Sequence, residues 1–162
     1  MIINNEIEPF EWNIAASEIQ DLKLRLRAAR WSQGVPLDYH REFCEYWAEE
    51  YDWFATQKRL NEFPQFVTVI DGIEFHFIQV KSKHSHATPL LITHGWPGSI
   101  VEFPKVIDPL VSPENHSGLP DDAFDVICPS LPGFGFSGKP SDYGWDVDRV
   151  AVAWDLLMDR LG

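Results

Sequence analysis

The residues with the clearest chemical potential occupy one turn, His94-Gly95-Trp96-Pro97-Gly98-Ser99, directly after the apolar run Leu90–Thr93. We expect this run to be a buried strand, and the turn after such a strand is where a parallel α/β sheet places its chemistry. Backbone N–H groups in the turn can face a substrate, where they would stabilise a developing oxyanion. The Trp96–Pro97 bond is predicted to be cis, because only bonds before proline adopt that form at low cost.

A second unusual segment, Pro129–Ser137, follows the apolar run Phe124–Cys128. The run is predicted to be another buried strand, and the prolines, glycines and phenylalanines after it indicate a rigid loop. Asp146 is expected to cap a last helix that ends at Gly162. One face of this helix would carry Val150, Trp154, Leu157 and Leu161.

The first 64 residues are predicted to be helical. Ser17 and Gln20 have the spacing of a capping box at the start of a first helix, and apolar residues then recur at helical intervals. A second helix is expected from Asp38, and a third over residues 52–61. The second helix has one aromatic face, which is typical of a buried core; its members are Tyr39, Phe43, Tyr46 and Trp47.

The periodicity changes after residue 64. Two runs, Gln65–Ile70 and Ile73–Val80, flank Asp71-Gly72, a strong signal for a two-residue hairpin turn. In the second run apolar residues alternate with Glu74 and His76, which predicts one buried face. Ser99 is expected to cap a helix that ends near Ile107, before Asp108-Pro109. The order hairpin, strand, helix, strand, helix predicts an α/β sheet with parallel strands.

The composition restricts the possible partners and compartment. The chain has 162 residues and a formal net charge of −12, which argues against nucleic acid or an anionic membrane as a partner. Cys44 and Cys128 match no metal spacing, and the loop with His84 and His86 offers no acidic or thiol ligand beside them. We therefore expect no metal and no cofactor. Two unpaired thiols, and no apolar run near the length of a membrane span, predict a cytoplasmic protein.

These motifs together resemble the epoxide hydrolases of the α/β-hydrolase fold. The turn at 94–99 is similar to their oxyanion-hole turn, and Pro129–Ser137 is similar to the loop after the next strand of their sheet. The N-terminal part resembles that of the microsomal type, through Arg30-Trp31, Tyr51-Asp52-Trp53, Leu60-Asn61-Glu62-Phe63-Pro64-Gln65-Phe66 and Ile70-Asp71-Gly72. The resemblance divides the chain into an N-terminal helical region, 1–64, and the first part of an α/β-hydrolase core, 65–162.

The resemblance implies that an epoxide is opened in two steps. An aspartate on the nucleophile elbow forms an alkyl ester, and a histidine paired with an acid activates the water that hydrolyses it. Tyrosines of a lid protonate the epoxide oxygen. The backbone N–H of Trp96 would be one oxyanion-hole donor in the second step, and the supporting turn would consist of His94, Gly95, Pro97 and Gly98. The expected substrate is a small apolar epoxide.

The chain departs from the family at its catalytic groups. No aspartate sits in a glycine-flanked turn of the elbow type, and the acid–histidine pair and lid tyrosines would lie further on. We therefore expect an inactive N-terminal part of an epoxide hydrolase, with an incomplete α/β-hydrolase sheet. The alternative is a non-catalytic binding or interaction module that a partner chain completes. Ester or haloalkane hydrolysis would keep the fold, but the N-terminal region argues against it.

An incomplete sheet has a consequence for association. In the complete fold, Leu90–Thr93 would lie between Phe124–Cys128 and a further strand. Without that strand its apolar residues form an unpaired sheet edge, and such an edge is a template for pairing with another chain. Self-association through this edge is therefore expected.

Overall fold

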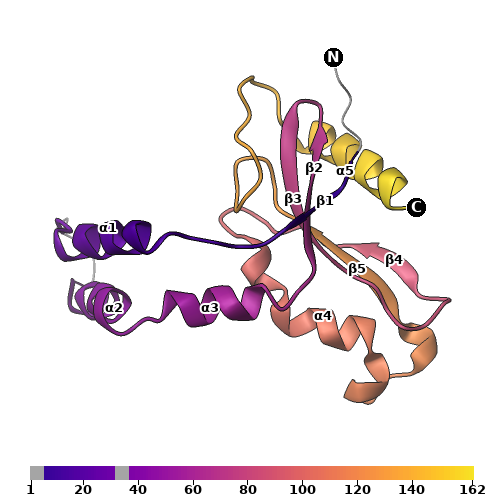
Figure 1. Cartoon of the computed structure of the whole chain (residues 1–162), viewed down its shortest axis with the longest axis horizontal. Coiled ribbons are helices and arrows are strands. Elements are labelled where there is room, and N and C mark those ends of the chain that lie inside the picture. The colour runs from indigo at the N-terminus through magenta and orange to yellow at the C-terminus, as the bar shows by residue number, and fades with distance from the viewer. Residues whose placement is uncertain (1–5, 32–36) are drawn as a thin grey trace. The chain divides into compact units, whose positions relative to one another are not determined.

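The computed structural model describes residues 6–31 and 37–162, and the chain forms two compact units (Figure 1). Residues 12–60 form a helical unit. The residues before and after them form the second unit, which is built on a five-stranded sheet. Among the described residues, no helix combines the length and apolar character needed to cross a membrane.

The helical unit contains α1 (Ala16–Arg27), α2 (Leu37–Glu49) and α3 (Trp53–Leu60). The prediction that Ser17 caps α1 is wrong, because the helix begins at Ala16 and the extended Ala15 precedes it. The N–H of Ile14 donates to Gln57 Oε1 of α3 at 2.9 Å, which holds the chain extended up to this point. Ser17 therefore falls inside the first helical turn.

The aromatic face of α2 is exposed rather than buried. The exposed fractions are 68% for Tyr39, 51% for Phe43, 51% for Tyr46 and 37% for Trp47. Among the described residues of this unit, only Trp12, Ala48 and Leu60 are buried. The expectation of a buried stripe is wrong because three short helices have too little apolar surface to enclose it.

The sheet has the strand order β1-β2-β3-β5-β4. Its strands are β1 (Glu8–Phe10), β2 (Gln65–Ile70), β3 (Ile73–Val80), β4 (Thr88–Leu91) and β5 (Phe124–Pro129). The hairpin of β2 and β3 has the predicted bounds, and Asp71 and Gly72 both have positive φ, as its turn requires. β4 and β5 are parallel, with Leu91 opposite Ile127, and the other pairs are antiparallel.

Strand β1 was not expected, since residues 1–64 were predicted to be helical. Its three residues are too few to show a strand periodicity, and Pro9 is compatible with a strand only at a sheet edge. Pairing with β2 places Phe10 opposite Gln65. A contact between distant segments thus defines this strand.

The segment between β4 and β5 contains α4 (Pro104–Val111) and three 3₁₀ turns: Ile100–Glu102, Pro113–His116 and Pro120–Asp122. Ser99 caps the first turn as expected, and its N–H donates to Glu102 Oε1 at 3.1 Å. The expected helix end before Pro109 is wrong, because Pro109 lies inside α4. A proline inside a helix costs about 3 kcal/mol, and burial of Ile107 and Val111 on either side offsets a loss of this size.

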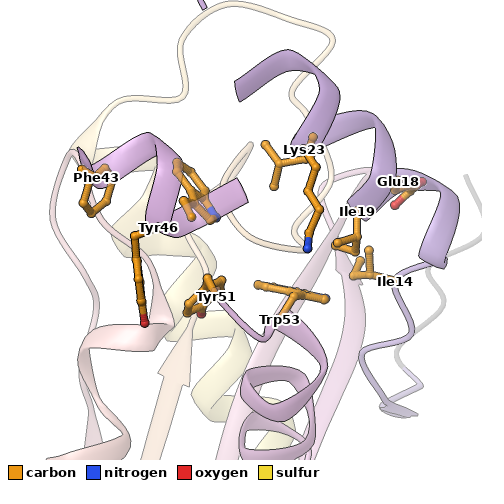
Figure 2. Close-up of a pocket in the computed structure, with 10 residues that line it drawn as sticks. Ile14, Glu18, Ile19, Lys23, Phe43, Tyr46, Tyr51 and Trp53 are labelled. Atoms are coloured by element: carbon orange, nitrogen blue, oxygen red, sulfur yellow. The ribbon is translucent and has the colours of Figure 1, made fainter. Parts of the chain in front are cut away.

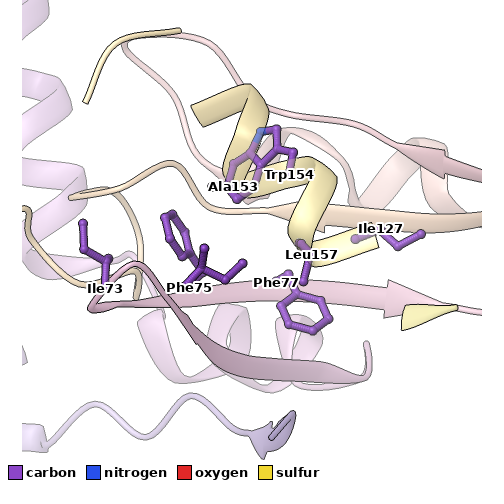
Figure 3. Close-up of a cluster of buried hydrophobic side chains, with 8 residues drawn as sticks. Ile73, Phe75, Phe77, Ile127, Ala153, Trp154 and Leu157 are labelled. Atoms are coloured by element: carbon purple, nitrogen blue, oxygen red, sulfur yellow. The ribbon is translucent and has the colours of Figure 1, made fainter. Parts of the chain in front are cut away.

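One buried apolar cluster of the sheet unit lies between the sheet and α5 (Val147–Leu161), as Figure 3 shows. Asp146 caps α5 by accepting the Arg149 N–H at 3.1 Å, as predicted. Trp154 and Leu157 are buried, and the other two members of the predicted face are partly buried against the same cluster. The strand partners in the cluster include Phe75, Phe77 and Ile127.

Candidate functional site

The two motifs singled out in the sequence lie side by side in the structure. Because β4 and β5 are parallel neighbours, their carboxyl ends share one edge of the sheet. The N–H of Leu131, after β5, donates to Nε2 of His94, after β4, at 3.1 Å. The rings of His94 and Phe134 pack edge to face with centroids 5.5 Å apart. The turn at 94–99 and the loop at 129–137 therefore form one candidate site.

Both ring nitrogens of His94 are engaged in holding this turn. Its Nε2 accepts the Leu131 N–H, so the proton resides on Nδ1, which donates to the Gly95 carbonyl at 2.9 Å. The side chain is buried, with 3% of the residue exposed. This arrangement leaves neither nitrogen free to take a proton from a water molecule.

Trp96 presents an unpaired backbone donor in the same turn. Its peptide bond with Pro97 is cis, as predicted. Within the part of the chain that the structure describes, the Trp96 N–H donates no hydrogen bond, and the residue is 83% exposed. A donor in this condition is available to an anionic group of a ligand.

The two glycines of the turn differ in their surroundings. A Cβ added at Gly98 would overlap the Glu102 carboxylate and fall 2.9 Å from the Gly95 carbonyl oxygen. The same carboxylate accepts the Ser99 N–H, so it cannot move away without losing the cap. A Cβ at Gly95 would meet nothing within 4 Å. Gly98 is therefore required by close packing, whereas Gly95 is not.

A buried polar cluster lies beneath the loop after β5, and the sequence analysis missed it. His76 of β3 is fully buried; its Nε2 donates to Gln65 Oε1 at 2.9 Å and its Nδ1 accepts from the Ser130 hydroxyl at 3.0 Å. The strand alternation had placed His76 on a polar face. Ile78 on that same face was the available signal that the second half of β3 is buried on both sides.

His76 is neutral in this environment. Burial lowers the pKa of its imidazole to about 4, since no charged partner compensates for the lost hydration. Phe10 and Phe136 pack against the ring with centroids 4.8 Å and 5.8 Å away. A neutral ring fits the pattern of one donating and one accepting nitrogen.

The remaining acid–histidine pairs lie away from the candidate site. His84 contacts Glu114 at 3.2 Å, His86 contacts Asp121 at 3.3 Å and His116 contacts Asp108 at 2.6 Å. The expectation that His84 and His86 lack acidic neighbours is therefore wrong in three dimensions. Ser82, close to His84 in the sequence, donates its N–H to Asp125 near the start of β5. The turn at 94–99 follows the other, carboxyl end of the parallel pair β4 and β5. Across residues 6–31 and 37–162, no three metal-ligating side chains gather in one place.

No carboxylate or thiol of this chain occupies a nucleophile position. All aspartates lie among the described residues, and none is in a tight turn that joins a strand to a helix. Asp71 is in the hairpin turn and binds Arg149, and Asp146 is a helix cap. Burial raises the pKa of the Cys128 thiol to about 12, so this residue is not a thiolate at neutral pH.

The helical unit contains an open apolar pocket of about 520 Å³ (Figure 2). Its lining residues are Ile14, Glu18, Ile19, Leu22, Lys23, Phe43, Tyr46, Trp47, Tyr51 and Trp53. The Lys23 side chain extends from α1 into the space beside Trp53. The exposed aromatic residues of α2 thus form one wall of a hollow rather than a flat surface.

Comparison with known proteins first defines the fold class of the sheet unit. The model of the alpha/beta hydrolase fold matches residues 88–162. The structure of Aspergillus niger epoxide hydrolase is 31% identical with a TM-score of 0.84, covering 99% of this chain and 44% of that chain. The structure of juvenile hormone epoxide hydrolase from the silkworm Bombyx mori is 35% identical with a TM-score of 0.82, covering 97% and 39%. The sheet unit is part of an α/β-hydrolase fold.

The family follows from the N-terminal match. The model described as epoxide hydrolase N terminus matches residues 7–103, and the chain belongs to the epoxide hydrolase family. A Stigmatella aurantiaca protein assigned as an epoxide hydrolase is 49% identical over 96% of this chain. Epoxide hydrolase 1 of Sus scrofa is 37% identical over 98% of it. The chain spans 38% of the length of each of these two relatives.

Proposed function

We propose that this chain supplies the oxyanion-hole turn and the N-terminal helical region of an enzyme that hydrolyses epoxides to vicinal diols. The observation that carries the proposal is the unpaired Trp96 N–H in a turn that Leu131 and His94 hold in place. Residues 1–64 would be the helical region and 65–162 the first part of the core.

In the proposed reaction, an aspartate that another part of the enzyme supplies attacks an epoxide carbon and forms an alkyl ester. Water activated by a histidine then adds to the ester carbonyl, whose oxygen becomes an oxyanion. The Trp96 N–H would donate to this oxygen, together with Gly95, Pro97 and Gly98 as the turn that orients it. In other enzymes with an oxyanion hole, the loss of one donor lowers kcat by about 10²–10³.

The substrate and the compartment are part of the proposal. The relatives named for epoxide hydrolysis support an epoxide as substrate, and we propose a small apolar one. Cys44 and Cys128 are free thiols in the structure, which supports a reducing, cytoplasmic location.

The sharpest test removes the Trp96 N–H and leaves every side chain in place. The chain would replace the matching 38% of the Stigmatella aurantiaca relative, and the amide of residue 96 would be replaced by an ester. We expect the chimera to hydrolyse styrene oxide, and the ester variant to lose about 10²–10³ in kcat. The alkyl-enzyme ester should accumulate, because its hydrolysis is the step that the donor assists.

The matched control is an amide-to-ester replacement at Tyr143, a fully exposed residue in the loop before α5. It makes the same backbone change away from the turn and should leave kcat unchanged. An unchanged kcat in the Trp96 ester variant would exclude the proposed role of this N–H. A chimera that folds but opens no epoxide would contradict the proposed function itself.

A non-catalytic interaction module is the second candidate, and the exposed aromatic residues around the pocket of the helical unit favour it. A module of this kind would bind a partner chain through that surface. Replacing Phe43 and Tyr46 by Ser would then abolish the association of the purified chain with that partner. The same replacements would leave the oxyanion turn, in the other unit, unaffected.

A further inference from the structure

We infer that His76 is a positioning residue for the oxyanion turn, acting through Ser130 and Leu131 on His94. The catalytic meaning of this role rests on the proposed function, but the hydrogen-bonded linkage itself does not.

The first step is that His76 fastens the loop after β5 at several points. Its backbone carbonyl accepts the Ser130 N–H at 2.8 Å and its backbone N–H donates to the Ser137 hydroxyl at 3.1 Å. The Ser137 hydroxyl in turn donates to the Ser130 carbonyl at 2.8 Å. The two serines that bracket the loop are thereby tied to one residue of β3.

The second step is that the ring of His76 selects one orientation of the Ser130 hydroxyl. Gln65 Oε1 is an acceptor, so Nε2 of His76 carries the proton and Nδ1 must accept. The Ser130 hydroxyl therefore donates to Nδ1 at 3.0 Å. A Cβ at Gly135, which has a φ of +53°, would fall 2.9 Å from this hydroxyl oxygen, so the absence of a side chain at Gly135 leaves space for the Ser130 hydroxyl in this position.

The third step joins the fixed loop to the turn. Ser130 is the direct neighbour of Leu131, whose N–H donates to Nε2 of His94. That bond leaves the proton of His94 on Nδ1, which holds the Gly95 carbonyl beside Trp96. His76 therefore carries its proton on Nε2, whereas His94 carries its proton on Nδ1. The His76 tautomer orients Ser130, and the loop that contains Ser130 and Leu131 in turn favours the His94 tautomer.

The experiment uses the 162-residue chain labelled with ¹⁵N. Ser130→Ala removes the hydroxyl that links the loop to His76 and leaves the backbone hydrogen bonds possible. We expect the His94 ring nitrogens to change from one tautomer to an exchanging mixture. We also expect the Leu131 amide to exchange with solvent about tenfold faster, as loss of one hydrogen-bond partner allows.

Thr68→Val is the matched control. Thr68 is also a buried hydroxyl of the same sheet, and it donates to the Glu6 carbonyl at 2.9 Å, outside the loop. Its replacement should leave the His94 tautomer and the Leu131 exchange unchanged. A general loosening of the sheet would affect both variants alike, so an equal effect would overturn the inference.

A second variant keeps the test possible if the Ser130→Ala chain does not fold. Ser137→Ala removes a different link between His76 and the loop and should change the Leu131 exchange in the same direction. Unchanged His94 and Leu131 signals in a folded Ser130→Ala or Ser137→Ala chain would overturn the inference. These readouts report hydrogen bonds rather than turnover, so they stand whether or not the chimera hydrolyses epoxides.

Discussion

The N–H of Leu131 donates a hydrogen bond to Nε2 of His94 across 37 positions of sequence. This bond joins the turn after β4 to the loop after β5, and it selects the tautomer of His94 that carries its proton on Nδ1. His94, which the sequence predicts as part of the supporting turn, makes hydrogen bonds through both of its ring nitrogens. In the proposed function the donor of this turn is a backbone N–H group.

Replacing His94 by Phe tests the structural role of its two ring hydrogen bonds. The aromatic ring would still pack against Phe134, but the Leu131 N–H and the Gly95 carbonyl would lose their partners in a partly buried site. We expect the free energy of unfolding to fall by about 1–3 kcal/mol, because water can replace the partner of the exposed Gly95 but less easily that of the partly buried Leu131. Urea unfolding would measure it. His86→Phe, at a side chain that is half exposed, should change stability by less than about 0.5 kcal/mol. Equal losses of stability in the two variants would contradict a structural role for the His94 hydrogen bonds.

The two glycines of the turn should respond differently to alanine. Gly98→Ala forces a methyl group onto Glu102 and the Gly95 carbonyl, so we expect a loss of about 1–3 kcal/mol in stability. Gly95→Ala enters open space and should stay within about 0.5 kcal/mol of the parent. Parallel urea melts of the two variants would decide, and a larger loss at Gly95 would show that the turn packs differently.

The stability of the sheet unit should depend on the protonation of His76. Its pKa is lowered from 6.5 to about 4 on folding, so the unfolded chain binds the proton more readily. The contribution is fully present above about pH 6.5, and it is lost as the pH falls towards 4, up to roughly 3 kcal/mol. Urea unfolding at several pH values between 7.5 and 4.5 would show the decline. In a folded His76→Gln variant the decline should be smaller, and an identical profile would exclude His76 as its source.

The free edge of β4 should cause self-association of the 162-residue chain. In the described part of the chain β4 pairs with β5 alone, and Leu90 and Leu91 are half-buried. We expect a dimer or larger species in size-exclusion chromatography with light scattering, because an unpaired apolar edge pairs with another chain. Leu90→Lys should shift the chain towards the monomer, whereas Val152→Lys on the exposed side of α5 should not. A parent chain that is a monodisperse monomer with cooperative unfolding would contradict this prediction.

The 162-residue polypeptide on its own should not hydrolyse epoxides. The described residues 6–31 and 37–162 contain the proposed oxyanion-hole donor, the Trp96 N–H, but no aspartate in a strand-to-helix turn and no acid–histidine pair beside the Trp96 turn. Without the groups that form and break the ester, the donor has no transition state to stabilise. Diol formation from styrene oxide would be compared with a buffer control. Turnover that survives purification and disappears in one Asp→Asn variant would contradict this prediction and identify that aspartate as the nucleophile.

Features that depend only on neighbouring residues could be predicted from the sequence. The β2–β3 hairpin, the cap of α5 at Asp146 and the cis bond at Trp96 follow from local patterns, and all three are confirmed. Turn residues, caps and strand alternation act over a few positions, so one sequence suffices to recognise them. The motif at 94–99 was recognisable for the same reason.

Features that depend on contacts between distant segments could not be predicted in this way. Only the pairing of β4 with β5 brings Leu131 to His94, and only the covering of β3 by Phe10 and Phe136 buries His76. The exposure of the aromatic face of α2 was likewise invisible in its periodicity, because the period shows that a face is apolar and not what covers it. Local patterns thus supplied the parts of the candidate site, and long-range packing set their protonation and contacts.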